Sequence, residues 1–200
     1  NAFVAYLRSH GIEPAITAST GIAATHIGGM TIHSWSGIGI ARKLDKSDLR
    51  QIASSKYIAP HVRRARVLII DEVSMLGPET LSMVDAVCRA VRQNSQPFGG
   101  LQVVLVGDFF QLPPVVRADE YDSAQATMLT EPAGRFAYES PAWARTNPTV
   151  CYLTEQYRQD DPEFLSILSA IRRNEFDEDH ARALESRKIT RERAPESAPK

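Results

Sequence analysis

The sequence contains two carboxylates, a carboxamide and a guanidinium that each come shortly after an apolar segment. Asp71 and Glu72 are adjacent, and Gln111 and Arg158 lie further along the chain. Such a set can act on a nucleoside triphosphate, because one carboxylate can hold magnesium while the other activates a water molecule. The amide can bind the terminal phosphate, and the guanidinium can neutralise charge that develops during transfer. Alone, the acidic pair is as often a simple strand end, so the interpretation depends on the whole set.

The elements that must position these groups are three short apolar segments, residues 67–70, 103–106 and 150–153. The first two have no polar alternation, which is typical of strands covered on both faces. A helix with Pro78 at its start is expected between them, over residues 78–92. Alternating strands and helices predict a three-layer α/β domain with a central parallel sheet. Because ligands of such sheets bind beyond the carboxyl ends of the strands, the four polar groups should meet at one edge.

The other segments are predicted without a definite chemical role. Asp108 is expected either to join this edge or simply to cap the loop that follows residues 103–106. Cys88 and Cys151 are expected to be buried, in a helix and a strand respectively. The remaining predictions are helices over 1–9, 45–54, 140–144 and 161–172, a strand over 15–17, a loop with a short helix over 18–40, and a loose tail from 186.

Composition limits the classes of protein to which the chain can belong. It has 200 residues, 43% of them hydrophobic, which suits one globular domain or one domain and the start of a second. No stretch approaches the roughly 20 apolar residues of a membrane span, so no membrane partner is expected. The formal net charge is −1, but residues 42–66 hold eight Lys or Arg against two Asp. Such a run is usually a solvated face and gives only weak support for phosphate binding.

Several segments together resemble the petite-integration-frequency (Pif-type) family of superfamily-one DNA helicases. Ile69-Ile70-Asp71-Glu72-Val73-Ser74-Met75 resembles its motif two, and residues 97–100 with 107–115 (Gly-Asp-Phe-Phe-Gln-Leu-Pro-Pro-Val) resemble motif three. Residues 17–24 and 28–39 resemble the strand-contacting motif Ia, and Glu155-Gln156-Tyr157-Arg158-Gln159 resembles motif four. The order and spacing of these motifs are more specific than any one of them.

The resemblance implies a RecA-like, phosphate-loop fold and ATP-driven, five-prime to three-prime unwinding of DNA, with ATP and Mg²⁺ as cofactors and single-stranded DNA and forks as partners. It implies that Asp71 holds Mg²⁺, Glu72 activates water, Gln111 senses the terminal phosphate and Arg158 contacts it. The implied DNA contacts are Thr17, Ser19, Thr20, Gly21, Ile22, Ala23 and His33. Trp35, Phe109 and Phe110 can stack on bases, although core packing is the preferred interpretation for the two phenylalanines.

The sequence departs from the family pattern in one respect. No Gly-x-x-x-x-Gly-Lys-Ser/Thr loop occurs in it, so the domain is expected to be incomplete at its N-terminus. The predicted division is a first motor domain over 1–154, the start of a second over 155–185, and a tail over 186–200. Two alternatives stay open: a catalytically inactive module that binds single-stranded nucleic acid or protein, and an ATPase that acts on another polymer. The family resemblance also suggests DNA repair, recombination and telomere maintenance, inside the cell, in the nucleus or mitochondrion of a eukaryotic source.

Overall fold

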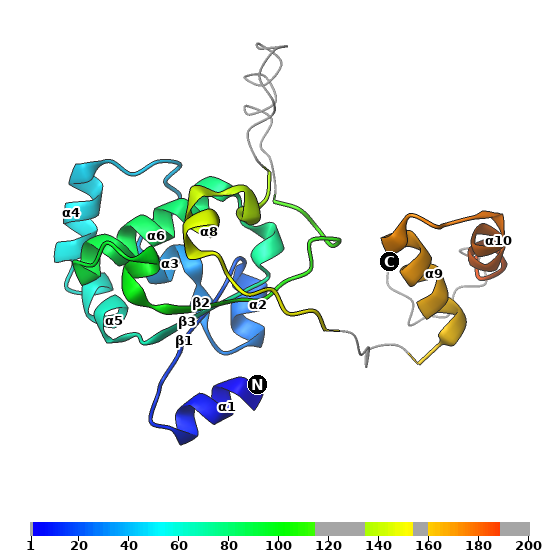
Figure 1. Ribbon diagram of the computed structural model, residues 1–200, viewed down its shortest axis with the longest axis horizontal. Helices are drawn as coiled ribbons and strands as arrows, with labels where there is room; N and C mark the ends of the chain where they lie inside the picture. Colours follow the sequence, from blue (N-terminus) through cyan, green and yellow to red (C-terminus); the bar gives the residue numbers. More distant parts are fainter. Residues whose placement is uncertain (1, 115–134, 154–159, 189–200) are drawn as a thin grey trace, which may run out of the picture. The chain divides into compact units, whose positions relative to one another are not determined.

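The structure, a computed structural model, describes residues 2–114, 135–153 and 160–188 (Figure 1). It divides into two compact units, Asn1–Thr149 and Val150–Lys200, which are considered separately. The strands of the first unit are β1 (Ala15–Ala18), β2 (Met30–Thr31), β3 (Val67–Asp71) and β4 (Gln102–Leu105). Its helices are α1 (Ala2–Ser9), α2 (Gly21–His26), α3 (Ile32–Ser36), α4 (Lys46–Ser54), α5 (Ile58–Arg64), α6 (Pro78–Arg92) and α8 (Pro141–Thr146), with 3-10 turns η1 (Val73–Met75), η2 (Pro97–Gly100) and η3 (Ala137–Glu139). The second unit contains α9 (Pro162–Arg173) and α10 (Glu178–Ser186).

The four strands form one parallel sheet in the order β2-β1-β3-β4. Ala18 at the end of β1 pairs with Asp71 at the end of β3, and Ile70 pairs with Leu105 at the end of β4. The carboxyl ends of these strands are therefore level with one another. The parallel sheet predicted from the non-alternating apolar segments is confirmed.

Both faces of the central strand β3 are covered, as its sequence predicts. Leu68 and Ile70 are fully buried in the larger core, which helices α3, α5, α6 and α8 help to build. Val67 and Ile69 point to the other face, where they pack with Leu7 of α1. Figure 1 shows α1 on one side of the sheet and α4, α5 and α6 on the other. This arrangement confirms the three-layer α/β fold.

Local sequence explains where several helices begin. Asp45 caps α4, since its carboxylate accepts hydrogen bonds from the amides of Ser47 and Asp48, and the Asp48 carboxylate accepts one from the Asp45 amide. Pro78 occupies the first turn of α6, where its missing N–H costs nothing. Helix α5 is a feature that the sequence interpretation missed. Pro60 lies in its first turn, a position that tolerates proline, and the surrounding basic residues gave no clear apolar period.

A fully buried carboxylate joins three elements of the first unit. Asp85 of α6 accepts hydrogen bonds from the Phe98 amide of η2 at 2.7 Å and from Arg89 at 2.9 Å. It also accepts one from Arg145 of α8 at 2.7 Å, across 60 positions of sequence. This side chain therefore fastens both α8 and the turn that leads into β4 to the long helix α6.

The prediction of a strand over residues 150–153 is wrong. These residues have no regular secondary structure, and Val150, Tyr152 and Leu153 are 60%, 86% and 96% exposed. Cys151 is also exposed, contrary to the burial expected for it, whereas Cys88 is buried as predicted. An apolar run becomes a strand only when another strand lies beside it, and none does so in the described part of the chain. The domain boundaries at 154 and 185 remain predictions, and much of the tail from 186 lies outside the described residues.

In the described ranges, no helix combines the length and the apolar character that a membrane crossing requires.

Candidate functional site

Backbone hydrogen bonds join the carboxyl ends of three strands. The Ser19 amide donates to the Asp71 carbonyl at 3.1 Å, which ties the end of β1 to the end of β3. The Val106 amide donates to the Ile70 carbonyl, and the Val73 amide donates to the Val106 carbonyl, both at 2.9 Å. The segments that follow β3 and β4 are thus held against each other beyond the sheet. This is the edge at which the sequence predicted a site.

Asp71 and Glu72 lie at this edge, half-buried. One oxygen of Asp71, Oδ1, accepts a hydrogen bond from the Glu72 amide at 3.0 Å. No donor among the described residues binds the other oxygen, Oδ2. Glu72 adopts a left-handed backbone conformation, with φ 54° and ψ 43°, which is unusual for a residue with a side chain. The sharp change of direction at Glu72 ends β3 and begins η1, so both carboxyl groups stay at the rim.

Gly107 lets the two segments approach closely. A Cβ atom at this position would lie 3.0 Å from both the amide nitrogen and Cγ1 of Val73, and 3.2 Å from the Ser74 amide nitrogen. Backbone atoms cannot move aside as a flexible side chain can, so any larger residue would push the two segments apart. The glycine of the Gly-Asp-x-x-Gln pattern therefore allows close packing against the segment that carries Asp71 and Glu72.

The residues after Gly107 form a tight, capped turn. Asp108 accepts a hydrogen bond from the Phe110 amide at 3.0 Å through Oδ1, and its carbonyl accepts one from the Gln111 amide at 3.0 Å. The Gln111 side chain is exposed and its Nε2 lies 3.3 Å from Asp108 Oδ2. Asp108 thus acts as the loop cap that the sequence offered as one of its two roles. Gln111 leaves from the same edge as Asp71 and Glu72, with its amide group accessible to solvent.

Most of the residues predicted to contact a DNA strand follow β1, and these are exposed or half-buried. Gly21 and Ile22 are exposed, and Ala23 is half-buried. Thr20 caps α2, since its hydroxyl accepts a hydrogen bond from the Ala23 amide at 3.2 Å. Thr17 is different: it is fully buried and its hydroxyl donates to the Ile69 carbonyl at 2.7 Å. This placement does not support the DNA contact expected for the Thr17 side chain, because that group joins β1 to β3 inside the fold.

His33 and Trp35 of α3 also differ from each other. His33 is half-buried, and this burial lowers its pKa below the usual value, so the ring is neutral at pH 7. Trp35 is 3% exposed and packs in the core, and His61 Nε2 donates to its carbonyl at 2.7 Å. Trp35 therefore has no face available for a base, contrary to the stacking considered for it.

The two neighbouring phenylalanines, Phe109 and Phe110, also differ in environment. Phe109 packs edge-on against Phe136, Tyr138 and Trp143, as the core interpretation predicted. Phe110 is 74% exposed, so core packing is wrong for this ring. The two rings differ in burial because consecutive side chains of a tight turn point in different directions.

Two serine hydroxyls at this edge are buried: that of Ser19, which was predicted as a DNA contact, and that of Ser74, to which the sequence interpretation gave no role. Within the described residues, Ser19 Oγ and Ser74 Oγ are shielded from solvent and have no hydrogen-bond partner. Ser74 follows Glu72 by two positions, and Ser19 is bonded through its amide to Asp71. Unsatisfied buried hydroxyls are costly, so these two are suited to a bound water or ligand atom. Ser74 was present in the motif-two segment, but its type alone gave no indication of burial.

Two further parts of the predicted site are Arg158 and the magnesium ion. Arg158 lies outside the described residues. No group of three or more His, Cys, Asp or Glu side chains that could bind a metal occurs in the described ranges. A magnesium ion that accompanies a nucleotide needs only one or two carboxylates, because phosphate oxygens and water supply its other ligands. Asp71, with one oxygen lacking a donor, fits that requirement.

Comparison with known proteins assigns the chain to a family. A model of the PIF1-like helicase family matches residues 1–179. The chain belongs to the PIF1-like helicase family. It is 46% identical over 163 residues to the ATP-dependent DNA helicase Pif1 of a Psychrobacter species, a match that covers 82% of this chain and 23% of that relative.

Solved structures of the family share this fold. The Candida albicans Pif1 helicase superimposes with a TM-score of 0.78 and 34% identity, over 97% of this chain and 41% of that one. A Bacteroides Pif1 helicase in complex with ADP-AlF3 and single-stranded DNA gives a TM-score of 0.76 and 34% identity, over 92% of this chain and 41% of that one. The RecA-like fold predicted for the chain is confirmed. The chain spans about a quarter of the length of its curated relative and less than half of each solved chain.

Proposed function

We propose that this chain forms part of the ATP-hydrolysing motor of a DNA helicase, which moves along single-stranded DNA and unwinds forks. The observation that carries the proposal is the joined edge of β3 and β4. There Asp71, Glu72 and Gln111 leave neighbouring strand ends, and the close approach at Gly107 keeps those ends together. Family membership supports the same function, since relatives are named ATP-dependent DNA helicases.

Each polar group has a distinct task in this proposal. Asp71 would hold Mg²⁺ through Oδ2, directly or through water, while Oδ1 stays bonded to the Glu72 amide. Mg²⁺ bound with ATP supplies charge neutralisation of the phosphates. Glu72 accepts a proton from, or orients, the attacking water, and its backbone turn fixes the carboxylate at the rim. Gln111 binds the terminal phosphate through its exposed amide, and Arg158 is proposed to neutralise charge on the transferred group.

The DNA strand is proposed to lie over the segment after β1. Small residues such as Gly21 and Ala23 allow main-chain groups to approach phosphates, and Ile22 is 77% exposed for contact with a sugar or base. Ser19, Thr20 and His33 lie in the same two segments. Since these contacts recognise no base, the strand would be bound without sequence preference. Repair, recombination and telomere maintenance inside the cell, in the nucleus or mitochondrion of a eukaryotic source, are the proposed settings.

The decisive experiment is Glu72→Gln in the full-length protein that carries this chain. ATP turnover stimulated by single-stranded DNA should fall by about 10² to 10⁴-fold, the usual contribution of general base catalysis. Binding of a fluorescent ATP analogue should be retained, because the amide has nearly the same shape. Glu79→Gln is the matched control: Glu79 is an exposed residue in the first turn of α6 and should leave turnover unchanged.

Two results would count against the proposal. Wild-type turnover in Glu72→Gln would remove the water-activating role of Glu72. Absence of ATP hydrolysis in the unmodified full-length protein, with DNA binding intact, would favour an inactive binding module instead.

A further inference from the structure

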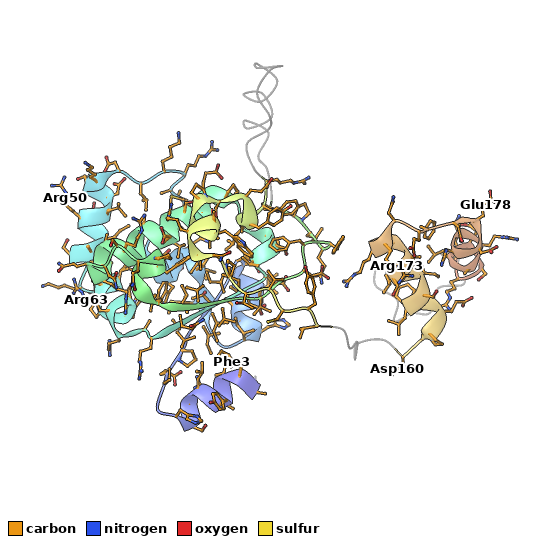
Figure 2. The ribbon with its side chains drawn as sticks, in the orientation of Figure 1. Phe3, Arg50, Arg63, Asp160, Arg173 and Glu178 are labelled. Atoms are coloured by element: carbon orange, nitrogen blue, oxygen red, sulfur yellow. The ribbon has the colours of Figure 1, made fainter. Side chains whose placement is uncertain are left out.

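A second charged surface lies away from the proposed catalytic edge. Arg64 ends α5, just before the amino end of β3, and Gln93 follows α6, ahead of the amino end of β4. This surface therefore lies toward the amino ends of the parallel strands, whereas Asp71 and Glu72 follow their carboxyl ends. Figure 2 shows Arg50 and Arg63 projecting from neighbouring helices on the same side of the first unit.

Two adjacent hollows form this surface, which we name the basic groove. One, of about 320 Å³, is lined by residues of α4, α5 and α6 that include Arg50, Ser54 and Arg63. The other, of about 360 Å³, is lined by residues that include Arg92 and Asn94. Arg63 and Gln93 line both hollows, so the two lie next to each other. No carboxylate and no aromatic ring is among the lining residues of either hollow.

Backbone carbonyls fix two of the guanidinium groups in the groove. Arg63 donates to the Val91 carbonyl at 3.2 Å and to the Ala53 carbonyl at 3.1 Å. Arg92 donates to the Gly99 carbonyl at 2.7 Å and to the Ala65 carbonyl at 3.0 Å. These partners orient the cations without cancelling their charge. A cation that is already ordered loses little entropy when it binds an anion.

The cations of the groove also lack the carboxylate partners that cations have elsewhere in the described chain. Arg8, Arg89, Arg145 and four cations of the second unit form ion pairs. Within the described residues, the three cations that line the groove, Arg50, Arg63 and Arg92, form no ion pair. The cations that neighbour them in sequence also form none: Lys46, Lys56, Arg64 and Arg66. The nearest acids in sequence, Asp45 and Asp48, accept hydrogen bonds from backbone amides at the start of α4, and Asp45 is attracted by the charge of Arg50 without forming an ion pair with it.

We propose that the basic groove binds the sugar-phosphate backbone of duplex DNA, as a contact separate from the single-strand path at the carboxyl edge. The proposal rests on the proposed function in that it takes DNA as the polymer. Fixed guanidinium groups match phosphate oxygens, and hydroxyl and amide groups such as Ser54 and Asn94 add contacts that recognise no base. Single strands are bound with aromatic platforms, which the lining lacks, and protein partners usually need an apolar anchor. A duplex offers regularly spaced charge and needs neither.

The test removes two exposed charges that support no other element. In Lys46→Gln/Arg50→Gln, both changes lie on α4 and keep good helix formers. Binding of a short fluorescent duplex to the chain is followed by anisotropy over a series of NaCl concentrations. The slope of log Kd against log[NaCl] should fall by about 2, since each neutralised phosphate contributes about 0.9. At low salt the duplex affinity should fall by about tenfold or more.

The matched control is Arg8→Gln/Lys188→Gln, which removes the same net charge from two exposed residues that already form ion pairs. The control should keep the wild-type slope. An unchanged slope in the α4 variant, or an equal loss in the control, overturns the proposal. An equal loss for single-stranded DNA, or loss of binding to an acidic peptide alone, overturns it too, because either assigns the groove to another ligand. ATP turnover stimulated by single-stranded DNA in the full-length protein should not change, which separates this test from that of Glu72.

Discussion

Replacing Asp85 by alanine should destabilise the first unit, because this carboxylate joins three of its elements. The carboxylate is fully buried and accepts three hydrogen bonds, from the Phe98 amide, Arg89 and Arg145. Phe98 is itself 1% exposed, so its amide has no access to water once the acceptor is removed. The two arginine side chains are 37% and 47% exposed and can be hydrated in place. The cost therefore comes chiefly from one orphaned amide.

The magnitude follows from these exposures. A buried donor left without a partner costs about 1–3 kcal/mol. Each arginine contact adds only about 0.5 kcal/mol, because both cations retain water. Asp85→Ala should thus lower the free energy of unfolding by roughly 3 kcal/mol. Asp85→Asn keeps an oxygen for the Phe98 amide and should cost about 1–2 kcal/mol.

Urea unfolding of the chain, followed by tryptophan fluorescence, measures these differences. Trp35 and Trp143 both lie in the first unit, and Trp143 is two residues from Arg145. For m-values of about 1–3 kcal/mol/M, the midpoint of Asp85→Ala should fall by at least about 1 M. Arg145→Gln serves as the control, with an expected loss below about 1 kcal/mol. Equal losses for Asp85→Ala and Asp85→Asn would refute the argument, since it assigns the difference to the Phe98 amide.

Two further predictions concern thiol reactivity and pH. Burial raises the pKa of the Cys88 thiol to about 12, so in the native chain a thiol reagent should modify the exposed Cys151 rapidly and Cys88 only after denaturation; two fast thiols would contradict this. In the second unit, hydrogen bonds from Arg187 hold the pKa of Asp161, the cap of α9, at about 2, below its unfolded value of 3.8. The stabilisation is present above pH 3.8 and is lost as the pH falls toward 2, so helicity of α9 should decline over that window by circular dichroism, and Asp161→Asn should lack this transition.

The proposed catalytic edge was largely predictable because its parts are local in sequence. Segments 67–70 and 103–106 lack polar alternation, which predicted two buried parallel strands with the polar groups directly after them. Both strands are parallel and β3 is buried, whereas β4 is only half-buried. A parallel sheet places all such groups at one edge, whatever the loops between them do. Asp71, Glu72 and Gln111 needed nothing more than this rule.

The predictions that were wrong share a different cause. Thr17 and Trp35 lie in segments that resemble a DNA contact, yet both are buried, because only packing decides which side chains of a short strand or helix face solvent. Residues 150–153 have the apolar composition of a strand but no neighbour to pair with in the described part of the chain.

Tertiary structure alone supplied the features that depend on distant pairs. The residue types of Asp85, Arg145 and Phe98 do not indicate that they meet, and the unpartnered hydroxyl of Ser74 is hidden until the fold is known. The basic run over residues 42–66 was visible in the sequence, but its chemistry was not. Folding brings Arg92, from outside that run, beside Arg63 and leaves both without carboxylate partners in the described residues. Sequence patterns report the environment of neighbouring residues, whereas charge compensation and close approach are properties of three-dimensional distance.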